Sequence, residues 1–328
     1  MDAEPNLRGN DPGLWGHSLA NLAEILLPLL DAVGARSLVE IGSYEGDLTR
    51  DLLRWASRSG AQVTAIEPMP QEELAELAER HPELELVRET SHKALRHVPL
   101  PDVVIVDGDH NYFTVSGELR MVDERASWAD GPLVLFHDVC WPHGRRDAYY
   151  EPDQIPEEYH DSMVHGAHVF PGNREARRTG LPYRWAARTE GGPRNGVLTA
   201  IEDFAAGRDE LRLAIVPAFF GLGVLWHRDA PWSAAVAEIL EPWDRNPIVA
   251  RLEANRVFHL ANEHVRRAEI MGLQERVEIQ EGVFRMMLKS RAFAWGEMLS
   301  RLRKGGKPLF SRELVRRALG EPDSRRGS

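Results

Sequence analysis

The sequence has 328 residues, of which 43% are hydrophobic and 28% are charged, as is ordinary for a globular protein. Its net charge of −11 argues against a general nucleic-acid binder. One cysteine, Cys140, excludes an internal disulfide and fits a reducing compartment. The N-terminus lacks a signal-peptide pattern, and no apolar run is long enough to span a bilayer. We therefore expect a cytoplasmic protein without a membrane span.

Helical and strand patterns alternate along the first 140 residues. Helical apolar spacing covers 18–33, 47–58, 71–81 and 115–127. Short apolar strands are expected at 37–42, 62–68, 84–90, 102–109 and 132–139. This alternation predicts βαβ units and a parallel sheet with both faces covered by helices. A further helix over 195–207 precedes two strands within 211–227, which we expect to close the sheet as an antiparallel hairpin.

The fold class that follows is α/β, with a Rossmann-like doubly wound sheet of seven strands and a C-terminal α-helical extension. The predicted parts are a helical lead-in over 1–34, a main domain over 35–230 and the extension over 231–328. Residues 140–196 interrupt the main domain with many Pro, Gly, Arg and aromatic residues and little periodicity. A segment of this length in a compact domain is typical of a lid or substrate-binding insert.

The extension is amphipathic over 246–304, which predicts a helical hairpin, and a last helix is expected at 311–319. We expect it to pack on the main domain or on a second copy in a homodimer. From Arg285 onward there are twelve Lys or Arg and four Asp or Glu, a net charge of +8. A solvated helical face explains this excess most simply, and an acidic partner or surface is the alternative.

Polar side chains follow the predicted strands at their carboxyl ends: Glu40 to Gly42, Glu67, Asp107 to His110, and His137 with Asp138. Ligands of parallel sheets bind beyond this edge. A carboxylate beside an apolar layer is costly unless it is paired or bound to a metal. A single Asp there would as readily cap a turn, but several such residues on neighbouring strands favour chemistry.

The turn "VEIGSYEGDL" after the first strand places Gly42 and Gly46 where a ligand can approach the backbone closely. It lacks the G-x-G-x-x-G pattern, and Glu40, Glu45 and Asp47 would repel a pyrophosphate. The same charge suits a ligand with an amino group and a sulfonium, and Glu67 is positioned to bond a ribose. These features predict S-adenosylmethionine as the cofactor.

"VEIGSYEG" resembles the first motif, and "TAIEP" the second motif, of the class I S-adenosylmethionine-dependent methyltransferases, over roughly residues 35–230. "IVDGDHNY" followed by "LVLFHDV" resembles the metal-dependent sugar O-methyltransferases of the macrocin and mycinamicin type and the related cephalosporin-hydroxylase-like proteins. The resemblance implies methyl transfer to a hydroxyl of a sugar or glycosylated small molecule, assisted by a divalent metal such as Mg²⁺. The implied cofactor-binding residues are Glu40, Gly42, Ser43, Gly46, Glu67, Ser91 and Asp107.

The same resemblance implies that Asp107, His137 and Asp138 bind the metal and that Asp109 or His110 is the base. His137 stands where relatives carry an acid, which is a departure from the pattern. Because Mg²⁺ prefers oxygen ligands, a His ligand would favour manganese, iron or zinc. Otherwise His137 is a second base and only two carboxylates contact the ion.

The insert adds residues that could bind an acceptor. Tyr149 and Tyr150 could stack on a sugar ring, and Arg145 or Arg146 could bind an anion. Its four histidines match no metal-binding spacing and are expected at the surface: His143, His160, His165 and His168. Two rival functions stay open at this point, an iron-dependent hydroxylase on the same scaffold and a non-catalytic protein that binds the cofactor or a partner.

Overall fold

The computed structural model describes residues 17–160, 162–304 and 311–319. The chain divides into two compact units, Met1–His264 and Val265–Ser328. The boundary falls within the long helix α8 (Pro247–Lys289). Each unit is described by itself.

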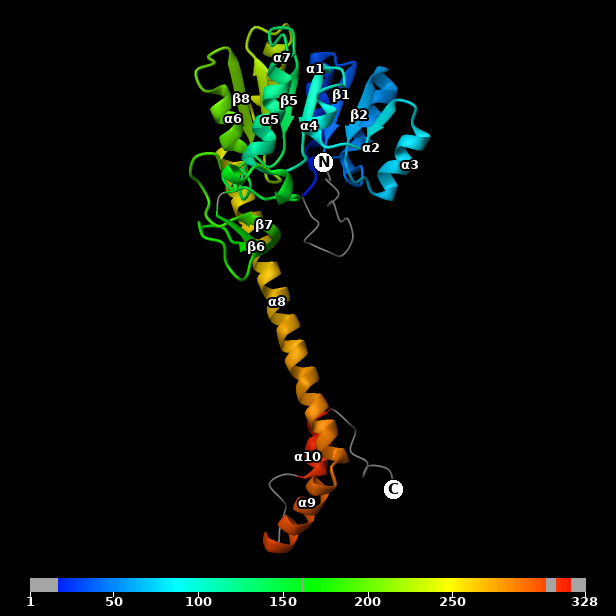
Figure 1. The fold of residues 1–328 in the computed structure, drawn as a ribbon, viewed down its shortest axis with the longest axis vertical. Coiled ribbons are helices and arrows are strands. Elements are labelled where there is room, and N and C mark those ends of the chain that lie inside the picture. The colour runs from blue at the N-terminus through cyan, green and yellow to red at the C-terminus, as the bar shows by residue number, and fades with distance from the viewer. Residues whose placement is uncertain (1–16, 161, 305–310, 320–328) are drawn as a thin grey trace. The chain divides into compact units, whose positions relative to one another are not determined.

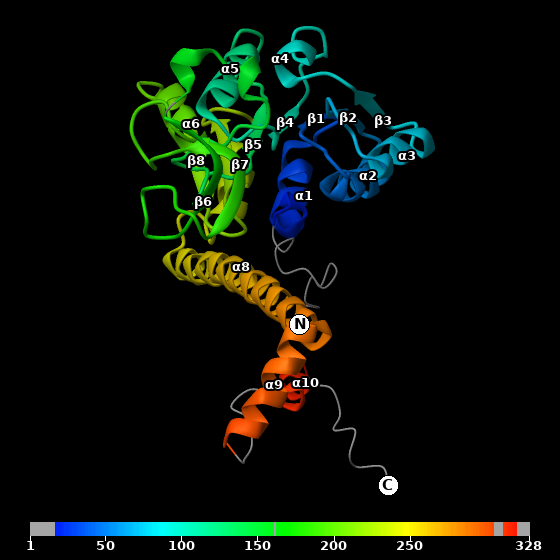
Figure 2. The ribbon, with the colours of Figure 1, turned by 60° about the horizontal axis from the view of Figure 1, so that its bottom comes forward.

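The first unit is built on a seven-stranded sheet of strand order β3-β2-β1-β4-β5-β9-β8 (Figures 1 and 2). Its strands are β1 (Ser37–Ile41), β2 (Gln62–Ile66), β3 (Leu84–Val87), β4 (Val103–Val106), β5 (Leu133–Phe136), β8 (Leu211–Val216) and β9 (Leu222–His227). Strands β1 to β5 pair in parallel, whereas β9 pairs antiparallel with both β5 and β8. The predicted Rossmann-like sheet of seven strands with a final antiparallel hairpin is confirmed.

Alternate residues of the strands enter two separate cores, one on each face of the sheet. In β4, Val103 and Ile105 belong to the first core, and Val104 and Val106 to the second. The first core is covered by α1 (Ala23–Val33), α2 (Asp47–Ser59), α3 (Glu72–Arg80) and α7 (Ser233–Leu240). The second is covered by α4 (Ser91–Ala94), α5 (Tyr112–Asp123) and α6 (Val197–Ala205). Two-sided burial is why these strands read as continuous apolar runs.

Helix α5 begins three residues earlier than the sequence pattern predicted. The Asn111 side chain accepts a hydrogen bond from the backbone N–H of Thr114, so the cap lies directly before Tyr112. An Asn that caps in this way satisfies one of the free N–H groups of the first turn. The helix therefore starts immediately after the polar end of β4.

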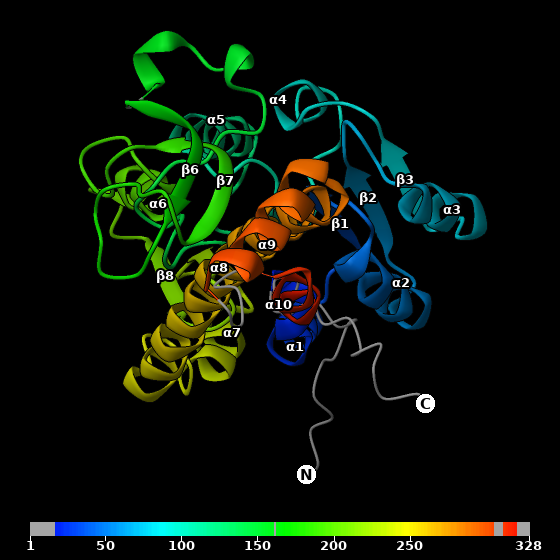
Figure 3. The ribbon, with the colours of Figure 1, turned by 90° about the horizontal axis from the view of Figure 1, so that it is seen from below.

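The insert contains regular structure that the sequence pattern did not predict. Strands β6 (Met163–Val169) and β7 (Leu181–Ala187) form a separate antiparallel pair, visible from below in Figure 3. Short 3-10 turns precede them at Pro152–Gln154 and Glu157–Tyr159, and another lies at Leu19–Leu22 before α1. Glycine and charged residues within these strands, such as Gly166 and Arg184, obscure the alternation that signals a strand.

The second unit continues α8 and adds α9 (Arg291–Lys304) and α10 (Arg312–Ala318). The predicted hairpin over 246–304 is wrong in form, because one helix runs without a break from Pro247 to Lys289. Ser290 separates it from α9. None of the helices in the described part of the chain is both long enough and apolar enough to cross a membrane.

Candidate active site

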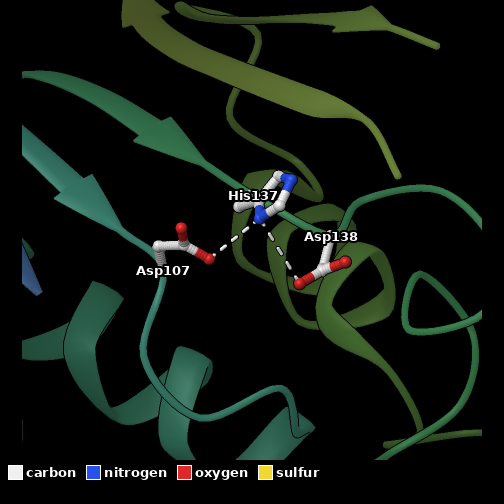
Figure 4. Close-up of side chains that lie close together, drawn as sticks. All are labelled: Asp107, His137 and Asp138. Carbon is white, nitrogen blue, oxygen red and sulfur yellow. Dashed lines mark hydrogen bonds and ion pairs between the residues drawn. The ribbon is translucent and has the colours of Figure 1, made fainter. Parts of the chain in front are cut away.

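Two carboxylates and an imidazole meet where the adjacent parallel strands β4 and β5 end (Figure 4). Asp107 follows β4, and His137 and Asp138 follow β5. The Nδ1 atom of His137 lies 2.9 Å from Oδ1 of Asp107 and 3.5 Å from Oδ2 of Asp138. Asp138 has a φ of 58°, a left-handed conformation that is uncommon outside glycine and that gathers at functional sites. The residues named from the sequence are thus brought together by neighbouring strand ends.

The tautomer of His137 is fixed by the loop between β8 and β9. Its Nε2 lies 2.8 Å from the backbone carbonyl of Phe219, which can only accept, so Nε2 carries a proton. The other nitrogen faces Asp107 and Asp138. Burial alone would lower the pKa of His137, but these two carboxylates and the hydrogen bond to Asp107 raise the pKa to about 10. A proton on Nδ1 is therefore one way to balance the two negative charges.

A divalent metal ion is the other way to balance the charges of Asp107 and Asp138, and the ligand atoms present are suitable for such an ion. The three ligand atoms, one each from Asp107, His137 and Asp138, lie within 4.8 Å of one another. Ligands about 2.1 Å from an octahedral ion stand about 3 Å apart, close to the 2.9 Å and 3.5 Å separations seen here. A ligating His that donates its other N–H to a backbone carbonyl is the usual outer support of a metal site.

A second imidazole shares Asp138 with His137. The Nδ1 atom of His110 lies 3.1 Å from Oδ2 of Asp138, and the His110 side chain is 14% exposed. A carboxylate at Nδ1 orients an imidazole so that its Nε2 can accept a proton. Burial would raise the pKa of Asp138, but His137, His110 and further histidines lower it to about 2, so this carboxylate stays ionised.

His143 was expected at the surface, and the structure places it in the site. It is buried, its ring stacks on that of His110 at 4.9 Å, and Tyr183 of β7 meets it edge-on. Burial lowers the pKa of His143 to about 3, so this ring is neutral and can pack against His110 without charge repulsion. One feature of the sequence could have indicated this position, since His143 follows Asp138 by only five residues.

The glycine turn packs directly against the backbone of Asp107. A Cβ atom on Gly42 would meet the carbonyl of Asp107 and would lie 2.6 Å from Cα of Gly108. Beneath the turn, Glu40 is buried and accepts hydrogen bonds from the hydroxyls of Ser43 and Thr49. Burial raises the pKa of Glu40 to about 7. These hydrogen bonds to the Glu40 carboxyl therefore fix the conformation of the glycine turn.

Glu67, after β2, braces the opposite side of the turn. Its carboxylate accepts hydrogen bonds from the backbone N–H groups of Tyr44 and Met69. Gly46 has a φ of 80° and precedes α2, which completes the turn. Ser91, at the start of α4, is buried near Glu118 of α5. Burial raises the pKa of Glu118 to about 8, and a hydrogen bond with Ser91 opposes this rise.

Asp109 organises the loop beside the site. Its carboxylate accepts hydrogen bonds from Asn111 and Thr114 and from the backbone N–H of Tyr150. The Tyr150 side chain is 60% exposed, and its ring lies 5.7 Å from that of His110. An exposed aromatic face therefore stands next to the oriented imidazole.

Other insert residues have structural roles. Arg146, which the sequence offered as an anion ligand, is 1% exposed and donates to the backbone carbonyls of Ala187, Arg188 and Arg174. The Tyr149 hydroxyl donates to Asp147, so this side chain is also turned inward. Arg145 contacts Glu202 at 2.6 Å. Sequence reasoning missed the Phe219 carbonyl as well, because a backbone contact from a distant loop leaves no trace in residue type.

Comparison with known proteins gives one family match. Residues 39–139 match a family model described as a methyltransferase domain. This stretch spans the glycine turn, Glu67 and the whole Asp107, His137 and Asp138 cluster, but less than half of the chain. None of the curated proteins compared with the chain matches it.

Solved structures give weak likenesses. A protein assigned as a caffeoyl-CoA O-methyltransferase from Staphylococcus aureus aligns with a TM-score of 0.40 and 12% identity, over 63% of this chain and 83% of its own. A methyltransferase from Podospora anserina with bound SAH aligns at 0.40 and 12%, over 67% and 89%. A protein assigned as an O-methyltransferase from Klebsiella pneumoniae aligns at 0.38 and 17%, over 67% and 92%. These TM-scores are too low for the similarities to support a functional assignment.

Proposed function

We propose that this chain is an S-adenosylmethionine-dependent O-methyltransferase that acts on a hydroxyl of a sugar or glycosylated small molecule. One observation carries the proposal. The glycine turn and the charged cluster share the backbone of Asp107, since Gly42 packs against it and the Asp107 side chain faces His137. A donor bound on the turn would therefore lie next to an acceptor bound at the cluster. The methyltransferase-domain match over 39–139 supports the same reading.

The residues that we assign to the cofactor are Glu40, Gly42, Ser43, Gly46, Glu67, Ser91 and Asp107. Of these, Glu67 is at the rim, 9% exposed, and a carboxylate that accepts two backbone N–H groups still has lone pairs for ribose hydroxyls. Glu40 is 2% exposed and acts by shaping the turn. When bound, S-adenosylmethionine supplies a methyl group already activated by its sulfonium, so positioning provides much of the rate.

Deprotonation of the acceptor falls to His110 in this proposal. Its Nδ1 is held by Asp138, and its Nε2 takes the hydroxyl proton while the acceptor oxygen forms its bond to the methyl carbon. The bond between that carbon and the sulfonium sulfur breaks at the same time, and its electron pair stays on the sulfur. General-base catalysis of this kind contributes about 10²- to 10⁴-fold. Asp109 holds the neighbouring Tyr150 backbone, and the exposed Tyr150 ring gives a sugar a face to stack on.

The candidate metal ligands are Asp107, His137 and Asp138. A divalent ion in this set would lower the pKa of a coordinated hydroxyl. The single nitrogen donor favours Mn²⁺ over Mg²⁺, which prefers oxygen ligands. Iron oxygenases use two histidines and one carboxylate, whereas this cluster has one histidine and two carboxylates, so the hydroxylase alternative is not favoured.

Calorimetric titration with S-adenosylhomocysteine, with and without Mg²⁺ or Mn²⁺, tests the cofactor assignment. We expect Glu67→Gln to weaken binding at least tenfold, because an amide has one acceptor oxygen where the carboxylate has two. Glu72→Gln, at an exposed position of α3, is the matched control and should bind as the wild type does. Wild-type protein that fails to bind the cofactor product would overturn the proposal. Methyl transfer to nucleotide sugars and glycosylated metabolites is then assayed with labelled S-adenosylmethionine.

A further inference from the structure

The second unit has almost no core of its own. Among its residues whose burial is described, Val315 alone is buried. Its exposed large apolar side chains are Ile270, Met271, Leu273, Val277, Ile279, Val283, Met286, Trp295, Met298, Leu299, Leu302 and Leu314. Scattered single apolar residues on a surface are normal, but a dense set of this kind marks an interaction site.

The exposed side chains of α8 form two lines on opposite sides of the helix. Ile270, Leu273 and Val277 are 53%, 56% and 51% exposed, and their spacing of three and four residues keeps them on one side. Ile279, Val283 and Met286 repeat that spacing further along. At about 100° per residue, the second line lies roughly 150° from the first. One flat interface could therefore cover the first line without the second.

Charge also favours a protein partner of the same kind. Residues 265–289 contain five Lys or Arg and four Asp or Glu, so two copies of this segment would not repel each other. The Glu281 and Arg285 side chains already pair within the helix, as on the polar faces of helical bundles. The basic excess of the chain begins only at the end of α8.

We propose that the second unit is a dimerisation module in which Ile270, Leu273 and Val277 pack against the same segment of a second copy. A stable interface draws on about 20 to 30 residues from each partner. Residues 265–289 of α8 and Arg291–Lys304 of α9 provide thirty-nine, and one face of each helix supplies roughly half of them, which reaches the lower end of that range. The contact is symmetric because the same surface is used twice. The inference does not depend on the proposed reaction.

Sedimentation velocity of the full chain between about 1 and 50 µM tests the proposal. We expect a particle of twice the 37.0 kDa of one chain. The double variant Ile270→Lys with Val277→Lys should raise the dissociation constant of the dimer at least tenfold, because each copy would bring two charges into the apolar contact between the helices. Glu278→Lys adds the same two units of positive charge at an exposed position beside the line and should leave the dimer intact. Unchanged binding of S-adenosylhomocysteine or an unchanged near-ultraviolet spectrum shows that the first unit of each variant is folded.

A wild-type chain that is monomeric throughout this range would overturn the proposal, as would a double variant that dimerises like the wild type. Co-sedimentation with vesicles that contain 30% anionic lipid is measured in parallel. A monomer that binds these vesicles, and loses binding in the double variant, would assign the surface to lipid instead.

Discussion

Replacing Gly42 with alanine should strain the chain where the glycine turn meets the charged cluster. Gly42 has a φ of +85°, and an added Cβ would lie 2.5 Å from the carbonyl carbon of Asp107 and 2.6 Å from Cα of Gly108. Ordinary contacts of a methyl group begin near 3.5 Å. The carbonyl oxygen of Asp107 is nearer still, and all three neighbours are backbone atoms, so relief requires the Asp107 segment or the turn itself to move by more than about 1 Å.

The expected loss of stability has two parts. A left-handed conformation costs a residue with a Cβ about 1 to 2 kcal/mol. Overpacking against a fixed backbone costs about 1 to 3 kcal/mol more. We therefore expect Gly42→Ala to lower the free energy of unfolding by about 2 to 5 kcal/mol. Gly34→Ala is the matched control, since Gly34 has a φ of +68° but nothing within 4 Å of the added Cβ, so only the first part applies.

Urea unfolding followed by near-ultraviolet circular dichroism measures both variants. Gly42→Ala should also weaken binding of S-adenosylhomocysteine, while Gly34→Ala should not, because Gly34 ends α1 away from the turn. If Gly42→Ala is no less stable than Gly34→Ala and binds equally well, then the turn is not pressed against Asp107 as described. The shared backbone on which the proposed reaction depends would then be lost.

Three further predictions concern the cluster and its surroundings. Between pH 4.5 and about 8 the folded wild type keeps a proton on Glu118 that the unfolded chain releases, so its stability falls as pH rises. Glu118→Leu removes this loss and should therefore be increasingly more stable than the wild type over the same range. Urea unfolding at several pH values should show the difference in free energy of unfolding growing by about 1.4 kcal/mol per pH unit at most. His110→Gln should reduce kcat for methyl transfer about 10²- to 10⁴-fold and leave the affinity for S-adenosylhomocysteine within threefold; an unreduced kcat would exclude His110 as the base. Mn²⁺ should raise the melting temperature of the wild type and have no such effect on Asp107→Asn; equal shifts would place the ion elsewhere.

The sheet and its polar edge could be predicted because both follow from short-range patterns. Runs such as Val103 to Val106 are apolar because each side of the sheet is covered, and chain direction alone carries Asp107 and His137 to the same edge. The start of α5 was misplaced because the Asn111 cap was not recognised, although Asn before a helix is a readable signal.

The surroundings of the cluster could not be predicted because they depend on contacts between distant segments. The carbonyl of Phe219 fixes the His137 tautomer across 82 positions of sequence. His143 was assigned to the surface from its spacing alone, yet β7 supplies Tyr183 to enclose it. Arg146 is satisfied by backbone carbonyls of the insert, which residue type cannot reveal.

Asp147 limits how the insert can open. Its carboxyl accepts hydrogen bonds from the backbone N–H groups of Tyr112, at the start of α5, and Gly196, at the far end of the insert. The Asn195 side chain accepts from the Asp147 backbone in return. Both ends of the insert are thus held at one buried residue, so we predict that the β6–β7 ribbon bends more readily than the whole segment lifts. Amide hydrogens at Tyr112 and Gly196 should accordingly exchange among the slowest, while those of the ribbon's connecting turn exchange freely.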